Sequence, residues 1–139
     1  MKTKPPLTKY KAVMIIDDND IDNFINERIL KAALISENVY VHTSAKSALE
    51  FLKNLESVKN IPKEIIPSYI FLDLNMPIMD GFQFMDAFQK FSDEFRSAIK
   101  IVILTTSLNP SDVETAKKFK QQIKFLYKPL NEAMLKEIE

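Results

Sequence analysis

Short apolar runs alternate along the chain with longer stretches in which apolar and polar residues are mixed. Three runs contain only apolar side chains and have the length of buried β-strands: residues 12–16, 69–72 and 101–104. Val39 and Val41 predict a short strand between the first two, and residues 123–127 predict a fifth. Unbroken apolar strands are typical of a parallel sheet whose two faces are both covered.

The mixed stretches between the strands carry apolar residues at helical spacing. The first predicted helix has the apolar positions Ile21, Phe24, Ile25, Ile29 and Ala32 or Ala33, with Asn19 or Asp20 as its cap. Four more helices are predicted from apolar positions within residues 48–55 after a Ser44 cap, 84–91 after Gly81, 113–119 after Asn109 and Pro110, and 134–138 after Asn131. Residues 56–68 contain Pro62 and Pro67 and indicate an exposed connection.

Five strands, each followed by a helix, predict an α/β fold. The alternation of helices with buried strands favours a doubly wound parallel sheet with helices on both faces. A chain of 139 residues suits one domain. We assign residues 11–139 to this domain and residues 1–10, which include three lysines and two prolines, to a flexible basic arm.

The composition excludes several classes of function. The chain has no cysteine, one histidine and one glycine, which excludes thiolate and multi-histidine metal sites and the glycine-rich loops that cradle nucleotide phosphates. Its 19 basic and 19 acidic residues give zero formal net charge and argue against direct nucleic-acid binding. No apolar run is long enough to span a bilayer and no export signal is evident, so we expect a cytoplasmic protein without a membrane partner.

Polar side chains gather where the predicted strands end. Asp17 and Asp18 follow the first strand, Asp73 the third, Thr105 the fourth and Lys128 the fifth. In an open parallel sheet these ends meet at one edge, where binding sites form. Three neighbouring carboxylates repel one another, and a divalent cation with oxygen ligands, such as Mg²⁺, relieves that repulsion. The lysine and the hydroxyl supply donors for an anion beside the metal, so these residues predict Mg²⁺-dependent phosphoryl chemistry on a carboxylate.

Four segments together carry a family resemblance: residues 15–18, residues 71–81 with the sequence Phe-Leu-Asp-Leu-Asn-Met-Pro-Ile-Met-Asp-Gly, residues 103–105 and residues 127–129. In this order they resemble the receiver domain of two-component response regulators, over essentially the whole chain after the arm. The resemblance implies a flavodoxin-like, doubly wound sheet with the strand order 2-1-3-4-5. It also implies a phosphoacceptor signalling protein that catalyses only its own phosphorylation and dephosphorylation.

The resemblance implies a role for each residue of the acidic group. Asp73 is the expected phosphoacceptor, which receives its phosphoryl group from a sensor histidine kinase or a histidine phosphotransfer protein. Asp18 is expected to bind Mg²⁺ directly and Asp17 mainly through water, with Mn²⁺ as a possible substitute. Asn75 is expected to offer its backbone carbonyl to the same metal.

The resemblance also implies residues that respond to phosphorylation. Lys128 would pair with Asp73 and then with the phosphoryl oxygens, Thr105 would hydrogen-bond the phosphoryl group, and Phe125 would occupy the switch aromatic position. Their movement would change the surface around the last two strands, which an unknown downstream protein recognises. The sequence leaves no residues for a DNA-binding or enzymatic output domain, so we expect a stand-alone receiver.

Two other functions compete with this one. An interaction module that keeps the fold but works without phosphorylation is expected to lose an acidic residue or Lys128, and all of them are present. A phosphatase of the haloacid-dehalogenase type needs a second aspartate two residues after its nucleophile, and Asn75 stands at that position. Both comparisons favour the receiver.

Some residues near the motifs have local explanations or depart from the family pattern. Asp20 and Asp22 fall in the first turn of a predicted helix, where a favourable interaction with the helix dipole explains them. Thr106 stands where the family usually has a small residue, which would narrow the phosphoryl site. Ser107 and Asn75 flank that site and leave the dephosphorylation rate open. Gly81 ends the Met-Asp-Gly turn, where we expect a positive φ angle.

Overall fold

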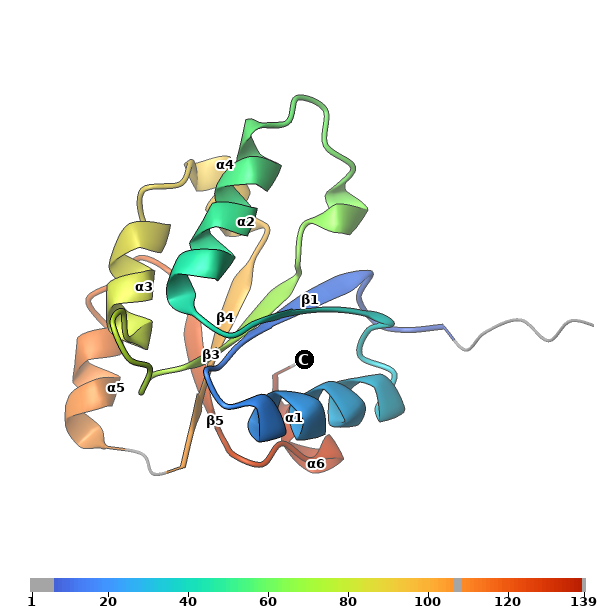
Figure 1. Ribbon diagram of the computed structural model, residues 1–139, viewed down its shortest axis with the longest axis vertical. Helices are drawn as coiled ribbons and strands as arrows, with labels where there is room; N and C mark the ends of the chain where they lie inside the picture. The colour runs from blue at the N-terminus through green and yellow to red at the C-terminus, as the bar shows by residue number, and fades with distance from the viewer. Residues whose placement is uncertain (1–6, 107–108, 139) are drawn as a thin grey trace, which may run out of the picture.

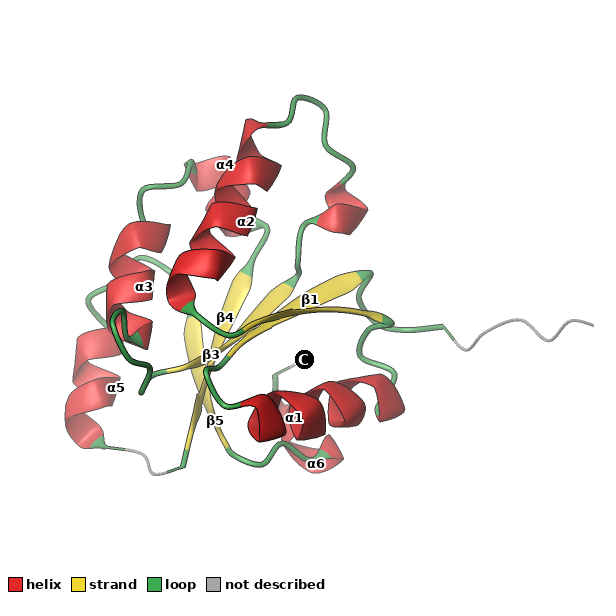
Figure 2. Ribbon diagram, viewed as in Figure 1, coloured by secondary structure: helices red, strands yellow, loops and turns green. Residues whose placement is uncertain are grey.

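The computed structural model describes residues 7–106 and 109–138. Five parallel strands form one sheet with the order β2-β1-β3-β4-β5. Their bounds are β1 (Ala12–Ile16), β2 (Asn38–His42), β3 (Tyr69–Asp73), β4 (Lys100–Thr105) and β5 (Ile123–Tyr127). The predicted fold class and strand order are confirmed, and Figures 1 and 2 show helices on both faces of the sheet.

The helices divide between the two faces. Their bounds are α1 (Asp20–Ala32), α2 (Ala45–Ser57), α3 (Gly81–Phe88), α4 (Asp93–Ser97), α5 (Pro110–Ala116) and α6 (Glu132–Glu137), with a short 3₁₀ helix η1 (Lys63–Ile65). Helices α2 and α3 cover one face, and α1 and α6 cover the other (Figure 1). Within residues 7–106 and 109–138, no helix has the length and hydropathy of a membrane span.

The central strands of the sheet place alternate residues in two separate cores, one on each face. Met14 and Ile70 belong to the core on the α2–α3 face. Their neighbours Val13 and Phe71 belong to the core on the α1–α6 face. Successive side chains of a strand point to opposite faces, so an apolar strand without interruption fills both cores.

The predicted helix starts are confirmed at four caps. The side chains of Asn19, Ser44, Asn109 and Asn131 each accept a backbone N–H of the helix that follows. Pro110 takes the first turn of α5, where its missing N–H costs no hydrogen bond. Local side-chain chemistry therefore sets where these helices begin.

The stretch between α3 and β4 differs from the prediction. Apolar spacing predicts one helix that reaches Phe91, but α3 ends at Phe88 and the separate helix α4 follows. Ser92 begins α4 by accepting the N–H of Phe95, while the carboxylate of Glu56 accepts the N–H of Ser92 at 2.8 Å. Phe91 and Phe95 are both buried, so the apolar spacing continues across the break and conceals it.

Helix α1 lies where the pattern predicts it but exposes residues that marked it in the sequence. Ile21, Phe24 and Ile25 are 69%, 59% and 40% exposed. The side chains that α1 buries include Asn23 and Asn26. These asparagines hydrogen-bond to the loops that follow β1 and β5, so amides take the place of apolar side chains on the inner face.

The expectation of a positive φ at Gly81 is wrong. The backbone of Gly81 has no positive φ, and the residue of this loop that adopts one is Ile78, at 69°. A Cβ atom at position 81 would lie 2.8 Å from the carbonyl oxygen of Asp73 and 2.9 Å from the Cα atom of Leu74. Glycine is needed here because α3 starts directly against the end of β3.

The N-terminal segment is described from residue 7 onward, so residues 1–6 of the predicted arm lie outside the described residues, as does Ser107. Lys9 and Tyr10 donate their backbone N–H groups to carbonyls just after α1. The Tyr10 ring meets the Tyr69 ring edge to face, with centroids 5.0 Å apart. These contacts join residues 9 and 10 to the folded part of the chain.

Candidate functional site

The polar residues that follow the strands meet at one edge of the sheet. β1 and β3 are neighbours with Ile16 opposite Leu72, so Asp17 and Asp73 leave the sheet side by side. β4 pairs with the other side of β3 and ends at Thr105. The topology therefore brings together residues that are far apart in the sequence.

Asp17, Asp18 and Asp73 form an acidic cluster. One carboxylate oxygen from each residue lies within 4.8 Å of the others. Asp17 and Asp73 are buried, whereas Asp18 is exposed and gives the cluster an open side. Mg²⁺ and Mn²⁺ prefer carboxylate and carbonyl oxygens, and Mg²⁺ keeps several waters when bound. The chemistry of these donors therefore fits a divalent cation.

Burial, and after it the charge of Asp17, raises the pKa of Asp73 to about 6. Two contacts act in the opposite direction on this pKa: the ammonium of Lys128, and the backbone N–H of Asn75, which donates to Asp73 Oδ1 at 3.3 Å. The charged form of Asp73 is thus held at a net electrostatic cost. A bound cation relieves that cost, which agrees with the donor chemistry of the cluster.

Lys128 places one positive charge among the carboxylates. Its Nζ atom lies 2.5 Å from Asp17 Oδ2, 3.1 Å from Asp22 Oδ2 and 3.4 Å from Asp73 Oδ1. Burial disfavours the ammonium, but these partners outweigh burial and raise the pKa of Lys128 above its ordinary value. The ammonium therefore stays charged and is shared by three carboxylates.

Asp22 is the residue of this site that sequence reasoning missed. It lies in the first turn of α1 as predicted, and the helix dipole accounts for it locally. Its carboxylate also accepts a hydrogen bond from Lys128, which is 106 residues away in the chain. A local pattern carries no signal of so distant a contact, so the dipole explanation was incomplete.

Thr105 and Phe125 lie on the other side of β3. Thr105 is buried at the end of β4, and its backbone carbonyl accepts the N–H of Lys128 at 2.9 Å. Phe125 is half-buried in β5, opposite Ile103, and packs against the core on the α2–α3 face. Thr106 is exposed. A direct backbone contact thus links the end of β4 to the lysine.

Comparison with known families identifies this arrangement. The response regulator receiver domain family matches residues 13–138. The chain belongs to this family. Receiver domains are phosphoacceptor signalling domains of two-component systems, and they interact with histidine kinases or phosphotransfer proteins. No curated protein matches the chain.

Solved structures of other receivers share the fold. A two-component response regulator from Cytophaga hutchinsonii superposes with a TM-score of 0.79 at 28% identity, covering 91% of this chain and 92% of that chain. A response regulator receiver protein from Dyadobacter fermentans gives a TM-score of 0.77 at 28% identity, covering 91% and 93%. The chemotaxis protein CheY4 of Vibrio cholerae, at 22% identity with a TM-score of 0.68 and 96% coverage of both chains, shares the fold alone.

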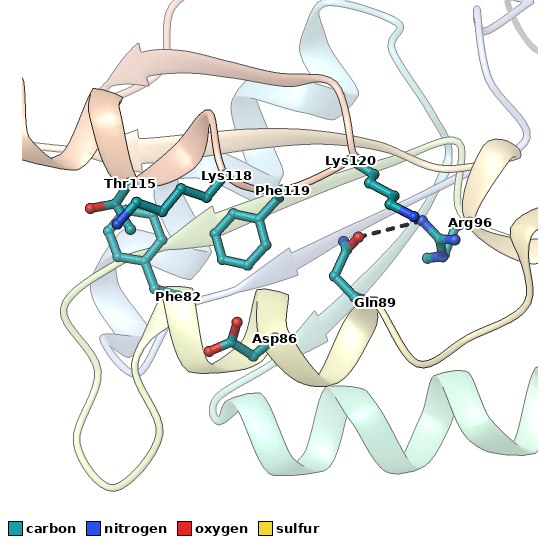
Figure 3. Close-up of a pocket in the computed structure, with 8 residues that line it drawn as sticks. All are labelled: Phe82, Asp86, Gln89, Arg96, Thr115, Lys118, Phe119 and Lys120. Atoms are coloured by element: carbon teal, nitrogen blue, oxygen red, sulfur yellow. Dashed lines mark hydrogen bonds between the residues drawn. The ribbon is translucent and has the colours of Figure 1, made fainter.

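A pocket of about 540 Å³ lies between α3 and the segment that ends α5 (Figure 3). Phe82 and Phe119 face each other in it with their ring centroids 6.2 Å apart. Farther along, Arg96 donates a hydrogen bond to Gln89 at 3.4 Å. The described residues that line this pocket include none of the acidic cluster, so it is separate from the receiver's carboxylate site.

Proposed function

We propose that this receiver takes a phosphoryl group onto Asp73 from the phosphohistidine of a sensor histidine kinase or a histidine phosphotransfer protein. One observation carries the proposal: Asp73 ends the central strand of the sheet beside two further carboxylates and the ammonium of Lys128. Membership of the receiver family supports the same role.

In the transfer, a carboxylate oxygen of Asp73 attacks the phosphorus atom of the phosphohistidine. An O–P bond forms and the P–N bond breaks, and the imidazole nitrogen keeps the electron pair of the broken bond and then takes a proton from water. The attacking carboxylate must be ionised, and a pKa of about 6 leaves most of Asp73 ionised at neutral pH. Lys128 lies close enough to follow the charge onto the phosphoryl oxygens.

Four groups are expected to hold Mg²⁺, or Mn²⁺ in its place: the carboxylates of Asp17, Asp18 and Asp73 and the backbone carbonyl of Asn75. When bound, the cation supplies positive charge that neutralises the phosphoryl oxygens during transfer. Asp18 is exposed and suited to direct contact. Asp17 is buried and already bonded to a backbone N–H and to Lys128, which supports contact through a water molecule.

Phosphorylation would act on the surface through Thr105 and Phe125. The phosphoryl group adds negative charge at the edge of the sheet, and the Thr105 hydroxyl is the group expected to turn towards it. The carbonyl of Thr105 already accepts the N–H of Lys128, so a shift at the end of β4 passes to β5. Phe125 is half-buried in β5 and can follow, which changes the surface that a downstream protein reads.

The exposed apolar face of α1, formed by Ile21, Phe24 and Ile25, supports docking of the phosphohistidine donor beside Asp73. Exposed apolar patches of this kind mark interaction surfaces. All three residues lie within about one turn of Asp22, which itself reaches the site through Lys128. A donor that covers this face with apolar side chains brings its phosphohistidine to the same edge of the sheet.

Residues 11–139 are proposed as the phosphorylatable domain and residues 1–10 as a basic arm. The family match over residues 13–138 supports these limits. The backbone hydrogen bonds of Lys9 and Tyr10 support their role as the point where the arm joins the domain.

Mass spectrometry after incubation with acetyl phosphate and Mg²⁺ tests the proposal. Wild-type protein should gain the mass of one phosphoryl group, and fragmentation should assign it to Asp73. The variant Asp73→Asn should gain none, while Asp86→Asn, which removes an exposed carboxylate of α3, should behave as wild type. Unmodified wild-type protein, or equal modification of Asp73→Asn, would contradict the proposal.

A further inference from the structure

Asp22 reaches the site from outside the acidic cluster. Its Oδ2 atom lies 3.1 Å from Lys128 Nζ, closer than the Oδ1 atom of Asp73 at 3.4 Å. The side chain of Asp22 is 35% exposed and that of Lys128 only 10%, so the contact forms at the rim of the site. The ammonium is thus shared by Asp17, the acceptor Asp73 and Asp22, and Asp22 is the member that the proposed transfer step does not use.

Two hydrogen bonds hold α1 so that Asp22 faces the lysine. Asn23 donates through Nδ2 to the backbone carbonyl of Asp17 at 2.8 Å. One turn later, Asn26 Oδ1 accepts the backbone N–H of Leu130 at 3.3 Å. The helix is therefore tied to the loop after β1 and to the loop that carries the lysine, and the carboxylate of Asp22 is fixed between them.

We propose that Asp22 is a positioning residue that competes with Asp73 for the ammonium of Lys128 and thereby slows phosphoryl uptake. This inference rests on the proposed function. Each carboxylate attracts the ammonium separately, so Asp22 draws Lys128 towards the rim of the site and away from Asp73. For Lys128 to follow the phosphoryl oxygens its contact with Asp22 must weaken, and that loss adds to the barrier of transfer.

Removal of the Asp22 charge should raise the rate of phosphoryl uptake in two ways. It releases Lys128 towards Asp73, and it lowers the repulsion of an incoming phosphoryl anion. Asp20 separates the two effects. It is an exposed residue of the same helical turn, and the carboxylates paired with Lys128 among the described residues do not include it. The variant Asp20→Asn therefore removes an equal charge and leaves the lysine contact in place.

The test compares initial rates of phosphoryl incorporation from acetyl phosphate at saturating Mg²⁺. Asp22→Asn should be faster than wild type by about 3- to 5-fold, the upper part of the range expected for one partly exposed ion pair. Asp22→Glu restores a carboxylate and should return the rate to within about twofold of wild type. Asp20→Asn should also stay within about twofold of wild type.

Dependence on the lysine distinguishes this role from a structural one. In a Lys128→Met background, Asp22→Asn should change the rate by less than about twofold, because the ammonium for which the carboxylates compete is gone. Without any phosphodonor, the ¹⁵N-resolved ammonium signal of Lys128 should shift in Asp22→Asn and stay in place in Asp20→Asn.

Three results would contradict the role of Asp22. An equal or slower rate in Asp22→Asn than in Asp20→Asn overturns the inference, as does an acceleration that persists in the Lys128→Met background or an ammonium signal that Asp22→Asn leaves unmoved. In all of these cases wild-type protein still gains its phosphoryl group, so the proposed function stands. Wild-type protein that gains none overturns the proposed function and this inference together.

Discussion

Helices α1 and α2 each have 13 residues and use their apolar side chains in opposite ways. α2 buries Ala48, Leu49 and Leu52 and so stabilises the core, as an amphipathic helix on a sheet does. α1 buries two asparagines and a leucine, and leaves Ile21 and Phe24 among its exposed residues. The contrast follows from what each helix faces, because α2 covers apolar strand residues, while Asn23 and Asn26 of α1 contact the loops of the carboxylate site and only the later part of α1, with Leu30, packs in the other core.

The difference teaches how one sheet serves both stability and chemistry. On the α2 side, the side chains that face the sheet are apolar and buried. On the α1 side, amide and carboxylate groups of Asn23, Asn26 and Asp22 hold the site residues, and the apolar side chains remain available on the outer surface. Changes in α2 should therefore alter stability first, and changes in α1 should alter phosphoryl transfer first.

The largest effect on stability is expected from Leu52→Ala in α2. Leu52 is fully buried in the core on the α2–α3 face, and loss of its side chain leaves a cavity that costs about 2–5 kcal/mol of unfolding free energy. The matched change in α1, Ile25→Ala, should cost less than about 1 kcal/mol, because the side chain is already substantially exposed. Urea unfolding curves measure both values, and equal losses would remove the distinction between the two helices.

In metal-free protein, Asp73→Asn is expected to raise the free energy of unfolding, by a smaller amount than Leu52→Ala lowers it. Burial and Asp17 raise the pKa of Asp73 from 3.8 to about 6, so between these pH values the folded protein holds a proton that the unfolded chain has released. The contribution of Asp73 to the free energy of unfolding should therefore fall as pH rises from about 4 to 6. Asp73→Asn lacks this fall and should be more stable than wild type at neutral pH by about 1–3 kcal/mol.

Urea unfolding in the presence of a chelator, at several pH values across this window, measures the Asp73 effect. Asp86→Asn is the matched control, because its carboxylate is exposed and should leave the pH dependence of wild type unchanged. Addition of Mg²⁺ should stabilise wild-type protein more than Asp73→Asn. Parallel pH curves for wild type and Asp73→Asn would show that the carboxylate is not held at an electrostatic cost.

The smallest effect on stability is expected from Phe24→Ala in α1. The exposed ring contacts the Arg28 guanidinium at 5.4 Å, and its loss should change the free energy of unfolding by no more than about 1 kcal/mol. Transfer from a phosphohistidine protein that labels wild type should slow by about 10-fold or more, as expected for an aromatic anchor of an interface. The rate with acetyl phosphate, which does not need the α1 surface, should stay the same. Equal slowing with both donors would place Phe24 in the fold or the chemistry and not in docking.

Much of the fold could be predicted because the relevant interactions are short in sequence. Asn19, Ser44 and Asn131 cap helices through residues three positions away, and apolar runs specify strands that are covered on both sides. The break between α3 and α4 was hidden by the buried phenylalanines on either side of it, which keep an unbroken apolar spacing. Ser92 caps α4 through Phe95, three residues away, and the further contact of Ser92 with Glu56 of a distant helix has no signal in the local sequence.

Most residues of the site could also be named in advance, since strand ends carry them and a parallel sheet brings strand ends to one edge. Asp17, Asp18, Asp73 and Lys128 do lie together, although the roles assigned to them stay predictions. The contact of Asp22 with Lys128 could not be predicted, because the two residues lie 106 positions apart and the local position of Asp22 already had an explanation.

The order of residues was enough for the five strands, for most of the helices with four of their caps, and for Asp17, Asp18, Asp73 and Lys128 at the sheet edge, since each of these follows from neighbours in the chain. The tertiary structure decided which face of α1 is turned inward, which carboxylates share Lys128, and that Gly81 is needed for a close approach to the end of β3. Those outcomes depend on atoms that folding brings from elsewhere in the chain. Helical spacing shows which residues share a face, but only the surface opposite determines whether that face is buried.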